Sequence, residues 1–469
     1  MPDRPSLYYV SRLGGGGESV ISPIVVALIA VAAIWTFCRP RKYAAFPMLL
    51  LSLLVPLGQG LVLGPFHVPV YRIMILIGWM RVLQGKLTAD KDFKGLKLHS
   101  LDWAIIISGI VASITFCMLY GWMDSTVNRL GFLYTSWGSY FLFRVLVRTN
   151  EDVDRLIKTL AFICIVLAVL MVREQMTGQN FFGYLGGVPL ANAVREGRLR
   201  SQGPFRHPIL AGTFSATVAP LFARLWVRRR AVRSLAIVGA VSAVVVTVTS
   251  ASSTPLLALV AGAFGLVLWP VRRNMRLLRW MIVFTLVALH MVMRAPVWAL
   301  INHIDIVGGS SGFHRFALID QTIRHFSDWW LYGIQDSGVW GWEMWDTSNT
   351  YVDVAVQGGI ASLLTFIALL VYGFKMIGLS RKRVETYDRR GAFALWALGC
   401  ALLANVVAFI GITYFDQNIV MWHVLLAMIV TAASIRQPPI TRECEGTKPD
   451  LAIGTTEGCI AGHQGLSAF

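Results

Sequence analysis

Uninterrupted apolar runs of about 20 residues recur along almost the whole chain, and no other feature constrains its fold as strongly. Such a run crosses a hydrocarbon core of about 30 Å when it is helical. Because lipid offers no partner for backbone N–H and C=O groups, each crossing segment must satisfy them internally. We therefore expect an all-α, polytopic membrane helix bundle of about 12 to 13 spans. The expected spans are residues 21–38, 44–64, 66–83, 101–120, 129–147, 157–173, 207–227, 234–250, 254–271, 280–298, 349–374, 393–413 and 415–435.

The composition supports this interpretation. Hydrophobic residues make up 56% of the 469 residues, charged residues make up 14%, and the mean hydropathy is +0.61. A soluble chain of this length needs more polar surface. The net charge of +17 would suggest nucleic acid in a soluble protein, but basic residues at cytoplasmic helix ends explain it here. We expect no nucleic-acid partner.

Basic residues cluster at alternate ends of the expected spans. The clusters lie at residues 39–42, 81–97, 144–158, 224–233, 272–279 and 375–390. Positive charge marks cytoplasmic ends, so the pattern predicts an N-terminus outside and a C-terminus in the cytoplasm. Residues 1–20 are then an outside tail and 21–436 the transmembrane domain. Residues 437–469 form a cytoplasmic tail whose Gly, Thr and Pro content predicts disorder.

Two larger connections fall outside, at residues 174–206 and 295–348. The first ends in an arginine cluster that contains Arg198, Arg200 and Arg206, and His207 follows it. Guanidinium groups beside a helix N-terminus favour an anion such as phosphate or carboxylate. Contact with lipid headgroups is the alternative, and the arginine bias of a GC-rich genome could account for the preference over lysine.

The second outer connection predicts an amphipathic helix capped by Ser310 or Ser311. Its apolar residues recur at helical spacing and are Phe316, Ile319, Ile323, Phe326 and Trp330. Arg315 falls in the first turn, where a cation opposes the helix dipole, and it has no acidic residue four positions away. We interpret it as an anion-binding residue. Arg324 lies four residues from both Asp320 and Asp328, so a surface ion pair is its simpler role.

Polar residues mark the start of the next expected span. Asp346, Asn349, Asp353 and Gln357 recur at three- and four-residue spacing and predict one polar stripe facing a cavity or partner, although Ser348 or Asn349 could simply cap the helix. His314 and His325 are about 16 Å apart along a helix and cannot share an ion. No cysteine pair has C-x-x-C spacing. We expect neither a metal nor a cofactor.

Three segments in order resemble the O-antigen ligase/polymerase superfamily of bacterial membrane glycan enzymes. They are Gly203–Pro208, Ser311–Arg315 with Trp330–Gly333, and Ser348–Tyr351 with Gly358–Ile360. The resemblance covers roughly residues 170–375 and implies a GT-C-like bundle. Ser348 stands where many ligases have histidine, and Gln357 or Gly358 where glutamate is common. The histidine base of the family therefore cannot be carried over, which favours an exopolysaccharide polymerase over a strict ligase.

The resemblance implies that glycan is polymerised or ligated from an undecaprenyl-diphosphate-linked donor onto an acceptor sugar, on the non-cytoplasmic face of a bacterial plasma membrane. The implied partners are that lipid-linked oligosaccharide, membrane lipid and other polysaccharide assembly proteins. Candidate catalytic residues are Arg315, Asp346, Asn349, Asp353 and His325, with Asp346, Asp353 or His325 as a base if one is needed. Candidate substrate-binding residues are Arg198, Arg200, Arg206, His207, Arg324, Tyr351 and Trp342.

Two other functions are compatible with a polytopic chain. A secondary transporter or lipid-linked glycan flippase needs polar residues within its spans and often has internal repeats. Few such residues occur, Arg72 and Asn405 among them, and no repeat is evident. A structural component of a secretion machine would have no reason to concentrate arginines in its outer loops.

The orientation can be tested with reporter fusions. Fusions at Gly186 and Ser337 should report the non-cytoplasmic side, and fusions at Arg230 and Arg383 the cytoplasm, because the basic clusters hold their ends of the spans inside. A cytoplasmic signal at Ser337 would overturn both the orientation and the function inferred from it.

Overall fold

The computed structural model describes residues 20–64, 66–93, 95–195, 197–228, 230–303 and 312–434. Each of the expected spans overlaps one α-helix. These helices are α2 (Pro23–Cys38), α3 (Arg41–Leu54), α4 (Val70–Leu87), α5 (Ser100–Tyr120), α6 (Trp122–Leu146), α7 (Asn150–Thr177), α8 (Pro208–Arg228), α9 (Arg233–Thr249), α10 (Ser253–Val267), α11 (Met275–Val292), α14 (Thr350–Glu385), α15 (Arg389–Ala408) and α16 (Gln417–Ser434). The expected tails fall outside the described residues, except that Val20 forms a β-bridge with Gly60.

Most of these helices can cross a membrane. Within the described residues, eight helices are long and apolar enough to span it, and α2 and α10 are shorter apolar helices. The helices α3, α4 and α6 are less apolar. The chain is therefore an all-α, multi-pass membrane protein, which confirms the fold class expected from the sequence.

One boundary was predicted wrongly. The spans expected at 44–64 and 66–83 meet in the sequence, but α3 ends at Leu54 and α4 begins at Val70. Between them, β1 (Gly60–Leu63) pairs antiparallel with β2 (Phe66–Pro69). Pro56 lacks an N–H and Gly58 disfavours helix, so the chain leaves the helix although its residues remain apolar.

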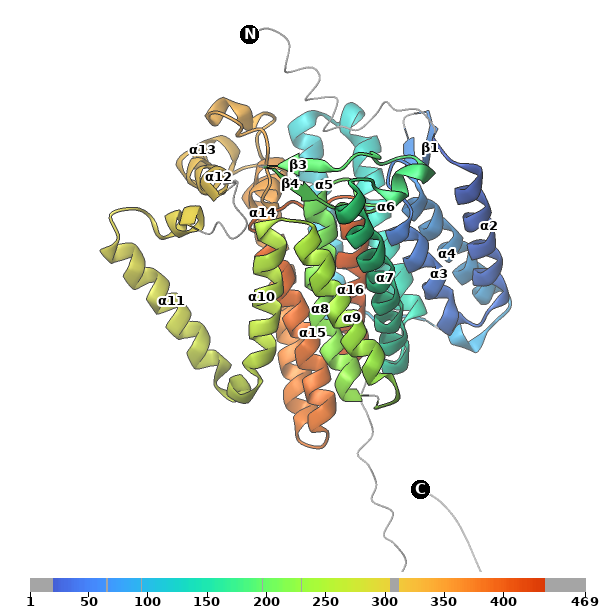
Figure 1. Cartoon of the computed structure of the whole chain (residues 1–469). Helices are drawn as coiled ribbons and strands as arrows, with labels where there is room; N and C mark the ends of the chain where they lie inside the picture. The colour runs from blue at the N-terminus through green and yellow to red at the C-terminus, as the bar shows by residue number, and fades with distance from the viewer. Residues whose placement is uncertain are drawn as a thin grey trace, which may run out of the picture. The chain divides into compact units, whose positions relative to one another are not determined.

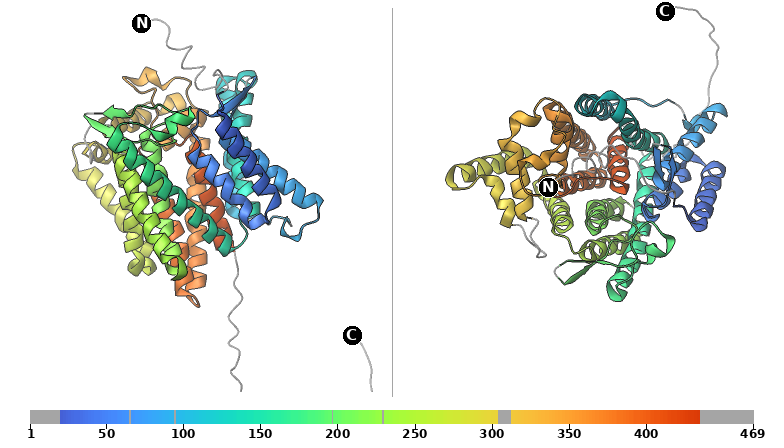
Figure 2. Two further views of the ribbon diagram at one scale, coloured as in Figure 1. Left: turned by 45° about the vertical axis from the view of Figure 1, so that its right-hand side comes forward. Right: turned by 90° about the horizontal axis from the view of Figure 1, so that it is seen from above.

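The helices surround α16, which is buried along almost its whole length. It contacts α6, α14 and α15, while α8 packs between α9, α10 and α15. Figures 1 and 2 show these helices running up and down between two ends. A buried centre made of one apolar helix leaves the surrounding helices to face lipid.

We call one end of the bundle the outer end, defined by the connections 178–207 and 293–349. It also carries the β1–β2 hairpin, a second hairpin of β3 (Ala193–Arg195) and β4 (Arg198–Arg200), and the helices α12 (Gly312–Arg324) and α13 (Phe326–Trp329) (Figure 1). The basic clusters lie in the connections of the opposite end. The alternation of charge along the sequence thus corresponds to two physically separate ends.

Helix α11 has no buried residue. In Figure 1 it stands apart from the neighbouring helices, joined to α10 at one end and to the outer-end segment at the other. Its entire apolar surface is available to lipid.

Helix α14 is broken near its outer end, where Gly359 has φ 67° and ψ −170°. The break lets loop residues bond to the helix backbone: the Ile334 N–H donates to the Val356 carbonyl at 2.8 Å, and the Ile360 N–H donates to the Trp330 carbonyl at 2.9 Å. Two of the segments that carry the family resemblance, around Gly333 and around Gly359, are therefore in direct contact. Non-helical backbone at this depth is tolerated because these bonds satisfy it.

Gly359→Ala should destabilise the protein. A Cβ there would lie 2.5 Å from the Leu331 carbonyl oxygen, and the positive φ costs any other residue roughly 1–3 kcal/mol. We expect lower abundance in membranes and a lower melting temperature in detergent. Gly378→Ala is the matched control, because this glycine of the same helix has open space around it and alanine is the better helix former. Equal stability of the two variants would contradict the packing described here.

Candidate functional site

The first outer connection is held in place by a buried carboxylate. Glu174, at the end of α7, accepts hydrogen bonds from the backbone N–H groups of Gln202 at 2.9 Å and Gly203 at 3.0 Å. Gly203 has φ 57°, which permits the turn, and its carbonyl accepts a bond from Asn180 at 2.7 Å. These contacts place the arginines before and after the turn in defined positions.

The arginines of this connection have different environments. Arg200 donates to the Ser250 carbonyl at 3.4 Å and to the Ser252 hydroxyl at 2.5 Å, so it is anchored to the α9–α10 connection. Burial lowers the pKa of Arg200, and neighbouring Arg195 acts in the same direction. Arg198 is exposed at the hairpin. Arg206 is also exposed, and no described residue accepts a hydrogen bond from its guanidinium.

The second outer connection differs from the amphipathic helix expected there. Helix α12 ends at Arg324, and His325, with φ −99° and ψ 34°, separates it from α13. Several residues of the expected core face, Ile323, Phe326 and Trp330 among them, are exposed. The buried residues of α12 are instead Gly312, Arg315, Leu318, Asp320 and Thr322. Part of the apolar face thus points outward, and polar residues are buried beside Leu318. The expected caps Ser310 and Ser311 lie outside the described residues.

The break at His325 also changes the expected ion pairs. Arg324 bonds to Asp320 at 2.6 Å, as predicted. Asp328 belongs to the next short helix and accepts a hydrogen bond from Trp340 at 3.1 Å, so the second expected pair is absent. Arg315 does lie in the first turn of α12, but it is buried instead of projecting into solvent.

Several candidates for base or sugar contact are engaged within the protein. The His325 ring stacks on Trp340 at 5.4 Å, and its Nδ1 lies 3.0 Å from the Gln321 carbonyl. The Tyr351 hydroxyl donates to the Val406 carbonyl at 3.0 Å, and its ring packs against Phe366 and Phe409. Trp342, by contrast, is 82% exposed and available to an external ligand.

The polar stripe expected at the start of α14 is only partly formed. Asn349 is the N-cap, accepting from the N–H groups of Tyr351 and Val352. Asp353 accepts bonds from Thr347 and Gln357, each at 2.7 Å. Asp346 precedes the helix and does not share its face, because the chain is not helical before Thr350.

A third outer connection, residues 409–416 between α15 and α16, is hydrogen-bonded to the start of α14. The Asn349 amide donates to the Ile410 carbonyl at 3.0 Å, and the Thr350 hydroxyl donates to the Ile412 carbonyl at 2.8 Å. At its other end, the Gln417 amide donates to the carbonyls of Pro204 at 3.2 Å and Val55 at 3.3 Å. The short connection therefore joins both larger ones, a role that its length did not suggest.

Charged groups from these connections meet at the outer end. His314 Nε2 lies 3.0 Å from the Asp346 carbonyl oxygen. Desolvation raises the pKa of the Asp346 carboxyl, Glu343 adds to this, and His314 and His207 oppose it. Desolvation lowers the pKa of His207, helped by Arg206 and Arg200. The mutual influence of Asp346 and His207 brings the two larger connections into one electrostatic site.

Arg72 and Asp416 belong to the same site, and the sequence analysis missed this. Arg72, on α4, donates to the His67 carbonyl at 2.7 Å, to Thr135 at 3.1 Å and to the Gly131 carbonyl at 3.2 Å. Desolvation lowers the pKa of His67, and Arg72 and Arg206 lower it further. The positive charges of Arg206 and Arg72 both act to lower the pKa of the Asp416 carboxyl. The sequence around Asp416 contains no arginine, so only the fold reveals this proximity.

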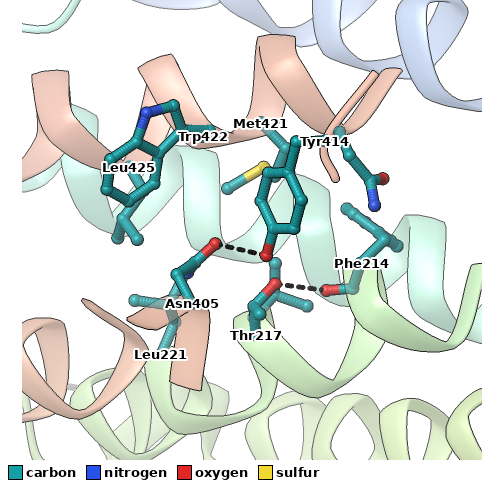
Figure 3. Close-up of a pocket in the computed structure, with 10 residues that line it drawn as sticks. Phe214, Thr217, Leu221, Asn405, Tyr414, Met421, Trp422 and Leu425 are labelled. Atoms are coloured by element: carbon teal, nitrogen blue, oxygen red, sulfur yellow. Dashed lines mark hydrogen bonds between the residues drawn. The ribbon is translucent and has the colours of Figure 1, made fainter. Parts of the chain in front are cut away.

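A small pocket lies deeper in the bundle, beneath the third connection (Figure 3). It has room for about one water molecule. The Tyr414 hydroxyl donates to Asn405 Oδ1 at 2.8 Å, and the Thr217 hydroxyl donates to the Phe214 carbonyl at 3.0 Å (Figure 3). This pocket is too small for a sugar or a lipid.

The comparisons with known proteins leave the family open. No protein-family model matches the chain, and no curated protein matches it significantly. The resemblance to the O-antigen ligase/polymerase superfamily therefore rests on the sequence segments named above.

Proposed function

We propose that this protein is a membrane glycosyltransferase-type enzyme that polymerises or ligates glycan from an undecaprenyl-diphosphate-linked donor onto an acceptor sugar. One observation carries the proposal: arginines and carboxylates from three separate outer connections meet at one end of an apolar bundle. Such an end suits a substrate that has an anionic diphosphate and sugars in water and a polyprenyl chain in lipid.

The proposed chemistry uses these groups in distinct ways. An acceptor hydroxyl attacks the anomeric carbon, and the diphosphate leaves with the bonding electrons. Fixed cations stabilise the negative charge that develops on the leaving group. Arg72 is held rigidly by three hydrogen bonds, whereas Arg206 is exposed and can turn its guanidinium to a phosphate. Exposed Trp342 offers a face on which a sugar can stack.

The helices support access from the bilayer. Helix α11 has no buried residue. At the outer end, exposed apolar residues of α12 and α13 continue this apolar surface. A polyprenyl chain can stay in lipid beside these helices while its diphosphate reaches the arginines. A flippase or secondary transporter is the alternative, and it would move the lipid-linked glycan without lengthening it.

The proposed location follows from charge. With the basic clusters in the cytoplasm, the outer end faces the non-cytoplasmic side of a bacterial plasma membrane. Lipid-linked oligosaccharides are used there, so we propose other polysaccharide assembly proteins as partners, together with the membrane lipid itself.

Arg206→Ala should weaken donor binding by about 10- to 100-fold, the usual loss for a charge-assisted hydrogen bond. Competition by undecaprenyl diphosphate against labelled donor on the purified protein measures this. Arg276→Ala is the control, because this exposed arginine lies at the opposite end of the bundle. Unchanged donor affinity in the Arg206 variant would argue against a diphosphate site at the outer end.

Arg315→Ala should abolish transfer, and Arg315→Lys should retain part of it, since lysine keeps the charge but loses the bidentate fork. Arg324→Ala should be milder, because its guanidinium is already bound to Asp320. Glycan formation is measured in one strain for all three variants. Arg315 is buried, so its replacement could also affect folding. The abundance of each variant is therefore measured together with glycan formation. Normal polymer at normal abundance from Arg315→Ala would exclude its assignment to the diphosphate.

A further inference from the structure

The third outer connection presents one carboxylate whose surroundings are unusual. Asp416 lies between Phe415 and Gln417, and both of these neighbours are fixed to the rest of the site. The Phe415 ring meets the His207 ring edge-on at 6.2 Å, and Gln417 bonds to Pro204 and Val55. Asp416 is therefore held between the end of the first outer connection and the end of α3.

The backbone conformation of Asp416 and the burial of its side chain both disfavour the folded state. Its φ of 57° is left-handed, a conformation that residues other than glycine adopt at some expense. Its Oδ2 atom is buried, and no described residue donates a hydrogen bond to it. Asp416 directly precedes α16, where an aspartate ordinarily caps the helix with its side chain; here only its backbone carbonyl accepts, from Ile419 at 3.2 Å. Unsatisfied buried carboxylates are rare because desolvation is expensive.

The charged groups around Asp416 come from two other elements. Arg206, in the first outer connection, and Arg72 and Tyr71, on α4, interact electrostatically with Asp416, and His67 interacts with both arginines. Neither arginine forms an ion pair with it. The cations are thus close enough to act on the carboxylate, yet they leave its buried oxygen for another donor.

We propose that Asp416 is the base that accepts the proton of the acceptor sugar hydroxyl, an inference that rests on the proposed glycosyl transfer. The hydroxyl O–H bond breaks as its proton passes to the Asp416 carboxylate. The oxygen forms a bond to the anomeric carbon, and the bond from that carbon to the diphosphate breaks. The diphosphate takes the bonding electrons beside the arginines, and the protonated Asp416 afterwards releases its proton to water.

Asp416 suits this role better than the other carboxylates of the site. Asp353 is engaged by Thr347 and Gln357, and Asp346 is exposed. Burial raises the pKa of Asp416 to about 6, against the opposing effects of Arg206 and Arg72. The group is then ionised at neutral pH but binds a proton more strongly than an ordinary aspartate, which is what a general base requires.

The test compares wild type, Asp416→Asn and Asp416→Glu as purified full-length proteins. The donor is lipid-linked oligosaccharide extracted from a strain that lacks the protein. Asp416→Asn should slow turnover by about 10²- to 10⁴-fold. It should bind undecaprenyl diphosphate at least as tightly, because a negative charge beside the arginines is lost. Asp416→Glu should restore part of the rate.

The pH profile separates catalysis from a structural role. Wild-type turnover should rise with pH through about 6 and then level off, as Asp416 ionises; the residual rate of Asp416→Asn should lack this step. The folded-state pKa lies above the ordinary value of 3.8, so ionisation destabilises the fold as pH rises through that window. Asp416→Asn should therefore melt no lower than wild type at pH 7 to 8.

Asp388→Asn is the control. It removes the same charge at the opposite end, and asparagine can keep the cap on α15, so its rate and pH profile should match wild type. If wild type transfers glycan and Asp416→Asn does so within a few-fold, with the same pH step, Asp416 is not the base and the proposed function stands. If Asp416→Asn lowers the amount of folded protein, donor binding and turnover to the same extent, Asp416 has a structural role. If wild type neither binds undecaprenyl diphosphate nor lengthens the glycan, both proposals fail.

Discussion

Backbone hydrogen bonding at the outer end is the constraint on which the rest of the structure depends. Three connections run there, and long stretches of them lie outside helices and strands, so their buried backbone groups need partners from other segments. A few side chains supply them: Glu174 holds the turn at Gly203, Asn349 and Thr350 hold the third connection, and Gln417 joins it to the first. The broken helix α14 does the same with its own backbone, by pairing residues near Gly359 with the second connection. Because each segment is tied to another, the charged residues they carry have fixed relative positions.

Those positions create a site with uneven charge. Arg72 donates three hydrogen bonds within the protein and is a fixed cation, whereas Arg206 is exposed and no described residue accepts a hydrogen bond from its guanidinium. Asp416 lies within electrostatic range of both arginines, and burial raises the pKa of its carboxyl. Asp346 is influenced instead by His314 and His207. Preorganised charge of this kind costs nothing to assemble when a substrate arrives, which is how such sites stabilise a developing anion.

The second outer connection illustrates where sequence reasoning fails in a membrane protein. The helical spacing of Ile323, Phe326 and Trp330 correctly indicates a helical segment with an apolar face. In a soluble protein that face would be buried. Here Ile323, Phe326 and Trp330 are exposed, and Arg315, Asp320 and Thr322 are buried together with Leu318 and Trp329. Helical spacing therefore indicates the helix but not which of its residues the fold buries.

The sequence by itself determined the helices and the separation of charge between the two ends. Both follow from local properties: apolar length decides what can cross lipid, and each basic cluster sits next to its own helix end. Only the tertiary structure decided that Asp416 and Arg72 join the arginines of the first outer connection. Asp416 lies in a short connection and Arg72 lies in a span. Both are more than one hundred positions from Arg206 in the sequence. Which connections meet depends on how the helices pack around α16, and no periodicity or spacing encodes that packing.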